Sequence, residues 1–154
     1  MRFLSQLFVS FLGVGYIRPF SASWGSLVSG IVLFFFWPAL EIWIKLVVVL
    51  AVFFLGSVMS GRLERDEHIH DPHFIVIDEV VGMMITCFFL PQVWWQWLIG
   101  FVLFRVFDVW KFWPASVFDE ESGGLAIMLD DVIMALPALI SLHFILILAS
   151  HSPF

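Results

Sequence analysis

Residues 75–84 read IVIDEVVGMM and residues 125–136 read LAIMLDDVIMAL, and each stretch sets two adjacent acids before an apolar run. A carboxylate near hydrocarbon is costly, so acids at the ends of membrane helices usually mark ion, proton or metal chemistry. Asp108 closes a further apolar run in the same manner. If these helix ends face the same side of a bilayer, their carboxylates form one hydrophilic site.

The composition assigns the chain to the membrane proteins. Its mean hydropathy is +1.03, it contains eight Trp and nineteen Phe, and only 13% of its residues are charged, whereas ordinary domains carry about 25% charged residues. Its length predicts a single membrane-embedded domain over residues 1–154. The net charge of −6 argues against a nucleic-acid partner, because phosphate backbones bind basic surfaces. The lone Cys87 excludes an intramolecular disulfide and a cysteine-based zinc site.

Five apolar segments predict an all-α integral membrane protein. They run over the following approximate ranges: Ser26–Trp37, Ile42–Ser60, Val80–Leu90, Val93–Phe107 and Val132–Ala149. A spanning helix needs about 20 residues, so the first, third and fourth segments cross only if their polar ends continue the helices. Residues 1–16 show no cleavage site and predict a retained amphipathic helix at the interface. We therefore expect about five short transmembrane or membrane-embedded helices and an N-terminal interfacial helix.

Two prolines fix the expected topology. Pro38 and Pro91 interrupt the apolar sequence and predict tight turns between antiparallel helices, on the same side as the C-terminus. The N-terminus and the two polar loops then lie on the other side, with every Lys and Arg except Lys45 and every acid except Glu41. The positive-inside rule puts that side in the cytoplasm. We therefore expect the carboxylates to converge at the cytoplasmic face.

The acid pairs have two interpretations. One Asp at a helix start caps free N–H groups. Asp78-Glu79 and Asp130-Asp131 would each leave a second carboxylate, which must be solvated, paired or bound to a metal. Oxygen ligands without cysteine favour Mg²⁺ or Mn²⁺ over zinc. The residues alone leave capping and metal binding both open.

Two further clusters carry charge. Arg105, Asp108 and Lys111 are spaced by three residues and share a helix face. They form either an ion pair beside snorkelling cations, or a clamp in which the two cations bind phosphate while Asp108 orients one of them or binds a metal. Residues 13–26, GVGYIRPFSASWGS, offer either a plain loop or an anion site in which Ser21 or Ser23 caps the next helix. Residues 68–73, HIHDPH, favour a solvated loop over a zinc site.

These blocks resemble the phosphatidylglycerophosphatase A family. The resemblance covers nearly the whole chain and rests on these stretches in order: Gly13 and Gly15, Trp24-Gly25-Ser26, Asp71-Pro72, IVIDEVVG at 75–82, FRVFDVWK at 104–111, Trp113-Pro114 and GGLAIMLDDVI at 123–133. It implies an integral protein of the bacterial inner membrane, with its active site facing the cytoplasm. It also implies a Mg²⁺-dependent lipid phosphatase of phospholipid biosynthesis, which hydrolyses phosphatidylglycerophosphate to phosphatidylglycerol and inorganic phosphate.

The resemblance also implies roles for individual residues. The implied catalytic residues are Asp71, Asp78, Glu79, Asp130 and Asp131, and all of these except Asp71 are also the expected metal ligands. The implied substrate-binding residues are Arg105, Asp108, Lys111, Trp24 and Ser26. In one departure, Asp119-Glu120-Glu121 stand where the family often has a basic pair, which leaves the range of lipid phosphates open.

Other functions compete with this one. A CDP-alcohol phosphotransferase is also acid-rich and Mg²⁺-dependent, but its D-G-x2-A-R signature is absent. A transporter would use the carboxylates as proton relays, spread through the depth of the membrane rather than gathered at one end. A non-catalytic adaptor would carry them as incidental helix caps. The rows of Phe and Trp face either lipid or a second copy of the chain, so a homo-oligomer also stays open.

Overall fold

The computed structural model describes residues 2–67, 72–110 and 123–151, and these residues form helices and turns without a strand. The all-α fold class is therefore confirmed for the described residues. Two predicted site residues, Asp71 and Lys111, and the acids at 119–121 lie outside them. The elements are α1 (Arg2–Val9), η1 (Val14–Tyr16), α2 (Ser21–Phe36), η2 (Trp37–Ala39), α3 (Ile42–Glu67), α4 (Ile77–Thr86), α5 (Trp94–Trp110) and α7 (Gly124–His151).

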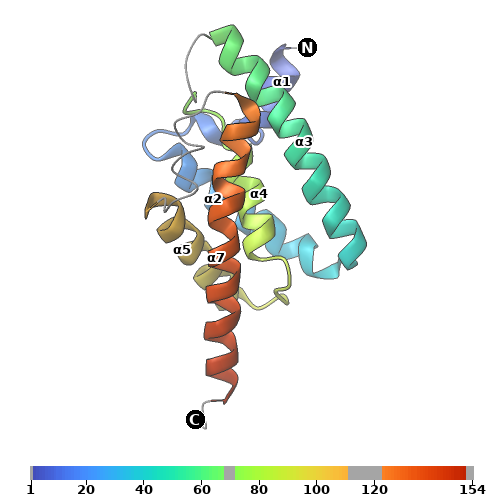
Figure 1. Cartoon of the computed structure of the whole chain (residues 1–154), viewed down its shortest axis with the longest axis vertical. Coiled ribbons are helices and arrows are strands. Elements are labelled where there is room, and N and C mark those ends of the chain that lie inside the picture. The colour runs from blue at the N-terminus through green and yellow to red at the C-terminus, as the bar shows by residue number, and fades with distance from the viewer. Residues whose placement is uncertain (1, 68–71, 111–122, 152–154) are drawn as a thin grey trace.

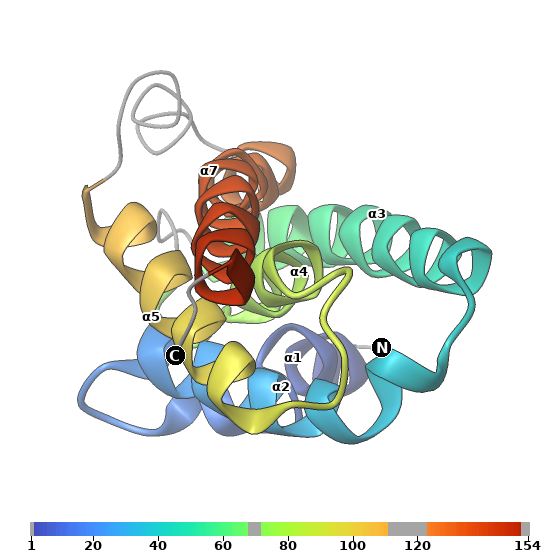
Figure 2. The ribbon, with the colours of Figure 1, turned by 90° about the horizontal axis from the view of Figure 1, so that it is seen from below.

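The short helix α4 lies at the centre of the molecule. Seen along the long axis, it is surrounded by α7, α3, α2 and α5, and it packs against each of them (Figure 2). Its side chains are buried almost all round, including Val80, Val81 and Met83, which belong to the hydrophobic core. A helix that is apolar on all sides is stable only inside such a ring of neighbours.

Three helical stretches are long and apolar enough to cross a membrane. They are Ser21–Ala39, Ile42–Asp66 and Gly124–Ser150. The ten residues of α4 rise only about 15 Å, half the thickness of the hydrocarbon layer, so α4 is embedded rather than spanning. Each of the five apolar segments of the sequence thus contains a helix, and the three stretches named above include neither α4 nor α5 among the described residues.

The predicted turns are present. Pro38 lies in η2, and Pro91 lies in the connection between α4 and α5. Both η2 and this connection lie toward the end of the molecule where α7 ends, whereas α1, the end of α3 and the start of α7 lie toward the other end (Figure 1). The buried Lys45 of α3 donates a hydrogen bond to the carbonyl oxygen of Phe88 at 3.1 Å and so fixes the α4–α5 connection to α3.

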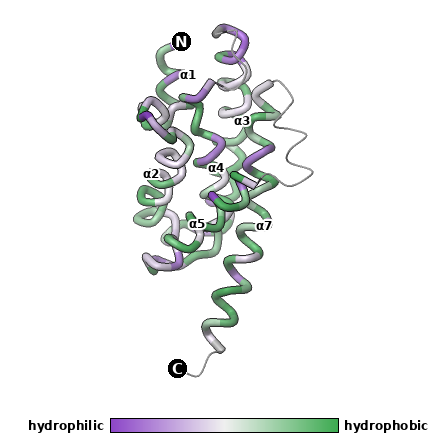
Figure 3. The backbone as a smooth tube through the Cα atoms, turned by 90° about the vertical axis from the view of Figure 1, so that its left-hand side faces the viewer, coloured by the Kyte–Doolittle hydropathy of each residue, from purple (hydrophilic) through white to green (hydrophobic). Residues whose placement is uncertain are grey.

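The two ends of the molecule also differ in hydropathy. Hydrophilic segments are prominent around the N-terminal end and beside α4, whereas the distal half of α7 is mostly hydrophobic (Figure 3). Large apolar side chains are exposed along α3 and α7, among them Val47, Phe54 and Ile140. Such surfaces are stable in contact with lipid chains rather than water.

Candidate metal and phosphate site

The first acid pair lies where the sequence predicts it. Asp78 and Glu79 occupy the first turn of α4, although the residue at the N-cap position is Val76, which makes no side-chain capping hydrogen bond. The second pair does not open a helix. Because α7 begins at Gly124, Asp130 and Asp131 lie about two turns inside it, and the prediction of a helix start at this pair is wrong. Gly123, whose φ is +119°, directly precedes the start of α7, and this glycine is the feature of the sequence that could have located the helix start.

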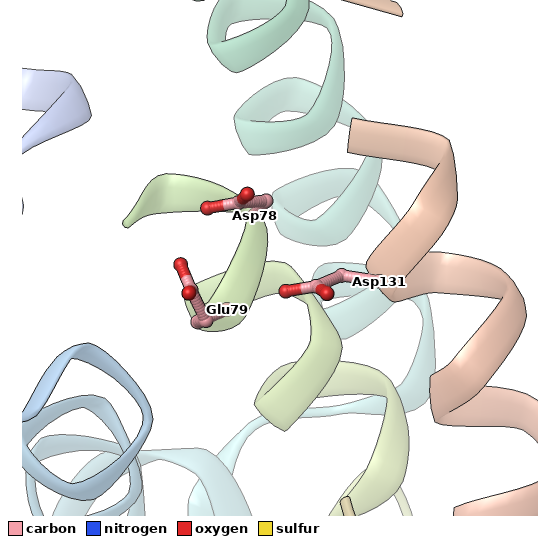
Figure 4. Close-up of side chains that lie close together, drawn as sticks. All are labelled: Asp78, Glu79 and Asp131. Carbon is pink, nitrogen blue, oxygen red and sulfur yellow. The ribbon is translucent and has the colours of Figure 1, made fainter. Parts of the chain in front are cut away.

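The acids from different helices meet in two overlapping groups. One carboxylate oxygen from each of Asp78, Glu79 and Asp131 lies within 4.8 Å of the others, and the three side chains share one space between α4 and α7 (Figure 4). Oxygens of Asp108, Asp130 and Asp131 form a second group at the same spacing. Asp131 belongs to both groups, so the five acids, called the carboxylate cluster below, join α4, α5 and α7.

Most of the carboxylate cluster is buried. Glu79, Asp108, Asp130 and Asp131 are each 8% exposed or less. Within the described residues, Oε2 of Glu79 and Oδ2 of Asp131 are buried without a hydrogen-bond partner. Burial raises the pKa of Glu79, on the non-spanning helix α4, to about 8. Buried like charges with unsatisfied oxygens are unfavourable unless a cation joins them, and an all-oxygen donor set suits a hard divalent cation.

A cation borders the carboxylate cluster. Arg105 Nη1 lies 2.7 Å from Asp108 Oδ2, so the i,i+3 ion pair of the first interpretation is present on α5. The same nitrogen donates a hydrogen bond to Ser26 Oγ of α2 at 3.3 Å, and Ser26 is fully buried and donates in turn to the carbonyl oxygen of Ala22. Arg105 therefore joins α2 to the acids. Trp24 is 41% exposed and, two residues from Ser26, lies on a different face of α2.

Close packing of α5 on α4 sets the position of Asp108. A Cβ atom on Gly82 of α4 would overlap the ring of Phe104, so only glycine admits the ring there. Phe104 is fully buried and lies one turn before Asp108 on α5. The sequence left two roles open for Asp108, orienting a cation or binding a metal, and the structure places it with Asp130 and Asp131. The spacing within FRVFDVWK could not reveal this, because the contact depends on how two helices dock.

The N-terminal stretch forms a separate feature. Arg18, Ser21 and His73 line a small pocket of about 190 Å³, which has none of the carboxylate cluster in its walls. The N-cap residue of α2 is Phe20, and no side chain caps the helix, so the expected capping by Ser21 or Ser23 is wrong. Of the predicted site residues that the structure describes, it thus gathers Asp78, Glu79, Asp108, Asp130, Asp131, Arg105 and Ser26, and leaves Trp24 apart.

Comparisons with known proteins point to one family. A family model described as Phosphatidylglycerophosphatase A matches residues 7–146. The chain is 38% identical over 130 residues to Phosphatidylglycerophosphatase A of Haemophilus influenzae, and the matched stretch covers 83% of this chain and 80% of that protein. It is 41% identical over 103 residues to Phosphatidylglycerophosphatase A of Escherichia coli, covering 66% of this chain and 59% of that protein.

A third relative carries a different name. The chain is 30% identical over 139 residues to a Putative phosphatidylinositol-3-phosphatase of Bacteroides thetaiotaomicron, covering 85% of this chain and 86% of that protein. No solved structure matches the chain.

Proposed function

The chain belongs to the phosphatidylglycerophosphatase A family, and from this membership we propose that it hydrolyses phosphatidylglycerophosphate to phosphatidylglycerol and inorganic phosphate. We further propose that the reaction depends on Mg²⁺ and serves phospholipid biosynthesis. The observation that carries the proposal is the carboxylate cluster beside Arg105, in a chain matched to the family over residues 7–146.

The donor set supports a divalent cation. Asp78, Glu79, Asp130 and Asp131 would hold the Mg²⁺, and the unpartnered buried oxygens of Glu79 and Asp131 fit that assignment. When bound, the metal supplies charge neutralisation at the phosphoryl group and lowers the pKa of a water molecule. The cluster has no sulfur or imidazole ligand among the described residues, which favours Mg²⁺ over zinc.

The basic side chains would bind the terminal phosphate. Arg105 carries a planar guanidinium suited to phosphate, and its contacts with Asp108 and Ser26 fix its orientation before substrate arrives. Such fixed donors lower the barrier because they need no rearrangement as charge develops. Lys111, which lies outside the described residues, remains the second proposed cation, and Trp24 and Ser26 remain proposed contacts of the headgroup.

A carboxylate of the cluster would accept the proton of the attacking water. Proton transfer to a positioned base contributes about 10²–10⁴-fold to such reactions, and several acids of the cluster lie close enough together to share this role. Asp71 is a further proposed catalytic acid outside the described residues. A covalent aspartyl-phosphate is the competing route. Hydroxylamine, which traps an acyl phosphate as a hydroxamate, would support this route if it modified a carboxylate of the cluster during turnover.

The proposed location is the inner membrane of a bacterium, with the active site facing the cytoplasm. The family members named above are bacterial proteins. The three helical stretches long enough to cross support a multi-pass protein. The cytoplasmic side is proposed because α1 and the last part of α3, which carry Arg2, Arg62 and Arg65, lie at the same end of the molecule as the start of α7 (Figure 1). Arg105 also lies beside the carboxylate cluster.

A second substrate is suggested by one relative. The protein of Bacteroides thetaiotaomicron is named for the 3-phosphate of phosphatidylinositol. Both lipids carry a phosphate monoester on the headgroup of a glycerophospholipid, so one cluster of acids and cations could hydrolyse either. What differs between them is the alcohol that bears the phosphate.

Phosphate release from both lipids tests the proposal. The protein in detergent is assayed with phosphatidylglycerophosphate and with phosphatidylinositol-3-phosphate, with Mg²⁺ and with EDTA, beside Asp78→Asn and the control Asp66→Asn on the exposed surface of α3. We expect Mg²⁺-dependent release from phosphatidylglycerophosphate that Asp78→Asn abolishes and Asp66→Asn retains. Faster release from the inositol lipid would move the assignment to that substrate, and release from neither would contradict the proposed function.

A further inference from the structure

An apolar groove lies between α2 and α5. Its volume is about 400 Å³, and its walls include Leu27, Ile31 and Phe34 from α2 with Trp97, Leu98 and Phe101 from α5. The two helices pack against each other on the side of α4 away from α3 (Figure 2). Since every one of these side chains is apolar, the groove suits a hydrocarbon ligand.

One end of the groove meets the phosphate-binding side of the site. Leu27 directly follows Ser26, and Phe101 lies one helical turn before Arg105. Ser26 and Arg105 are joined by the 3.3 Å hydrogen bond that connects α2 to α5. The groove therefore starts about one turn from the guanidinium and runs away from the carboxylate cluster.

The walls of the groove are held in place. The indole of Trp97 donates a hydrogen bond to the carbonyl oxygen of Pro91 at 2.8 Å and meets the ring of Phe34 edge-on, with centroids 5.9 Å apart. Trp97 is buried, whereas Ile31 and Leu98 at the rim are 54% and 51% exposed. The floor is thus rigid and the rim is open toward the surface that faces lipid.

We propose that this groove binds an acyl chain of the substrate lipid, with the terminal phosphate at Arg105 and the carboxylate cluster. The inference rests on the proposed function, because it takes a glycerophospholipid with a phosphate monoester as the ligand. A polar end with a cation that continues directly into an apolar channel matches the two ends of such a lipid. Along α2, Leu27 to Phe35 rises about 12 Å, so a long chain contacts the whole groove and a six-carbon chain only its first part.

Chain-length dependence tests the groove. For each protein, kcat/KM is measured with dioleoyl and with dihexanoyl phosphatidylglycerophosphate in the same detergent, and the ratio of the two values is compared. Ile31→Trp and Leu98→Trp fill the groove from opposite walls. The control is Val32→Trp, since Val32 is the neighbour of Ile31 on α2, is 42% exposed and is outside the groove lining.

We expect the ratio to fall about tenfold in Ile31→Trp and Leu98→Trp, and to stay near the wild-type value in Val32→Trp. A ratio unchanged in both groove variants, or lowered equally in Val32→Trp, would overturn the groove assignment while leaving the proposed function intact. Absence of phosphate release by the wild-type protein from either lipid would instead overturn the proposed function, and the groove assignment with it.

Discussion

A Cβ atom on Gly61 of α3 would lie 2.8 Å from the backbone nitrogen of Gly124 at the start of α7, so the two backbones meet with no room for a side chain. A Cβ atom on Gly124 would likewise overlap the carbonyl oxygen of Ser57. Small residues permit such approaches between membrane helices. Since α7 carries Asp130 and Asp131 about two turns further on, this contact helps to set where the two acids lie.

Gly61→Ala should destabilise the protein. Helix propensity alone predicts that the change stabilises α3 by about 1 kcal/mol, whereas overpacking against α7 costs about 1–3 kcal/mol. Because the obstacle is backbone rather than the end of a flexible side chain, we expect the cost to exceed the gain and α7 to shift. The melting temperature in detergent and phosphatase activity should both fall. A higher melting temperature would show that the helices separate easily at this contact.

Asp131→Asn should raise the stability of the metal-free protein and lower its phosphatase activity. Asp131 belongs to both groups of the carboxylate cluster and is 4% exposed, so the variant loses one ligand and one buried charge. We expect kcat to fall about 100-fold or more. In EDTA the variant should unfold at higher temperature than the wild-type protein, because repulsion among buried acids is relieved. Asp66→Asn, exposed on α3, should alter neither quantity. Equal stability of wild type and Asp131→Asn in EDTA would contradict the picture of a strained, metal-free cluster.

Mg²⁺ should stabilise the folded wild-type protein. A ligand that binds only the folded state at a hundred times its Kd adds about 2.7 kcal/mol to the free energy of unfolding. The increase in melting temperature between EDTA and Mg²⁺ should be large in the wild type and small in Asp131→Asn, since the variant lacks the ligand shared by both groups. The same increase in both proteins would place the ion elsewhere.

The sequence predicted the helices better than their docking. Turn prolines and apolar runs located all five membrane segments, and the meeting of acids from α4 and α7 followed from the turns at Pro38 and Pro91. The pattern misjudged the start of α7, because the apolar residues between Gly124 and Asp130 look like a loop approach until the helix is seen. The sequence predicted that the acids at the helix ends converge, but not which of them meet, because the contact of Asp108 with Asp131 depends on the ring of Phe104 packing onto Gly82. Contacts of this kind arise from the packing of two helices and leave no periodic signal in either.

Arg105→Lys should lower catalytic efficiency while keeping the positive charge. One guanidinium nitrogen contacts both Asp108 and Ser26, and the flexible ammonium of lysine cannot reproduce that planar, fixed donor arrangement. We expect kcat/KM to fall between about 10-fold and 100-fold, the scale of a misplaced substrate-positioning group. Arg62→Lys, on an exposed position of α3, is the control that should keep wild-type activity. Full activity in Arg105→Lys would mean that only charge is needed at this position.

The last turn of α3, which contains Arg65, should lie on the cytoplasmic side of the membrane. Glu41 precedes one end of this helix and Arg65 lies near the other, and both are exposed. In spheroplasts of an expressing bacterium, a membrane-impermeant maleimide should therefore label Glu41→Cys from outside, and should label Arg65→Cys only after lysis. The native Cys87 is fully buried and serves as the background in the unmodified protein. The reverse pattern of labelling would put the carboxylate cluster on the outer face. It would then separate the site from a substrate made in the cytoplasmic leaflet, and the proposed place of the enzyme in phospholipid biosynthesis would be wrong even if the hydrolysis itself were observed.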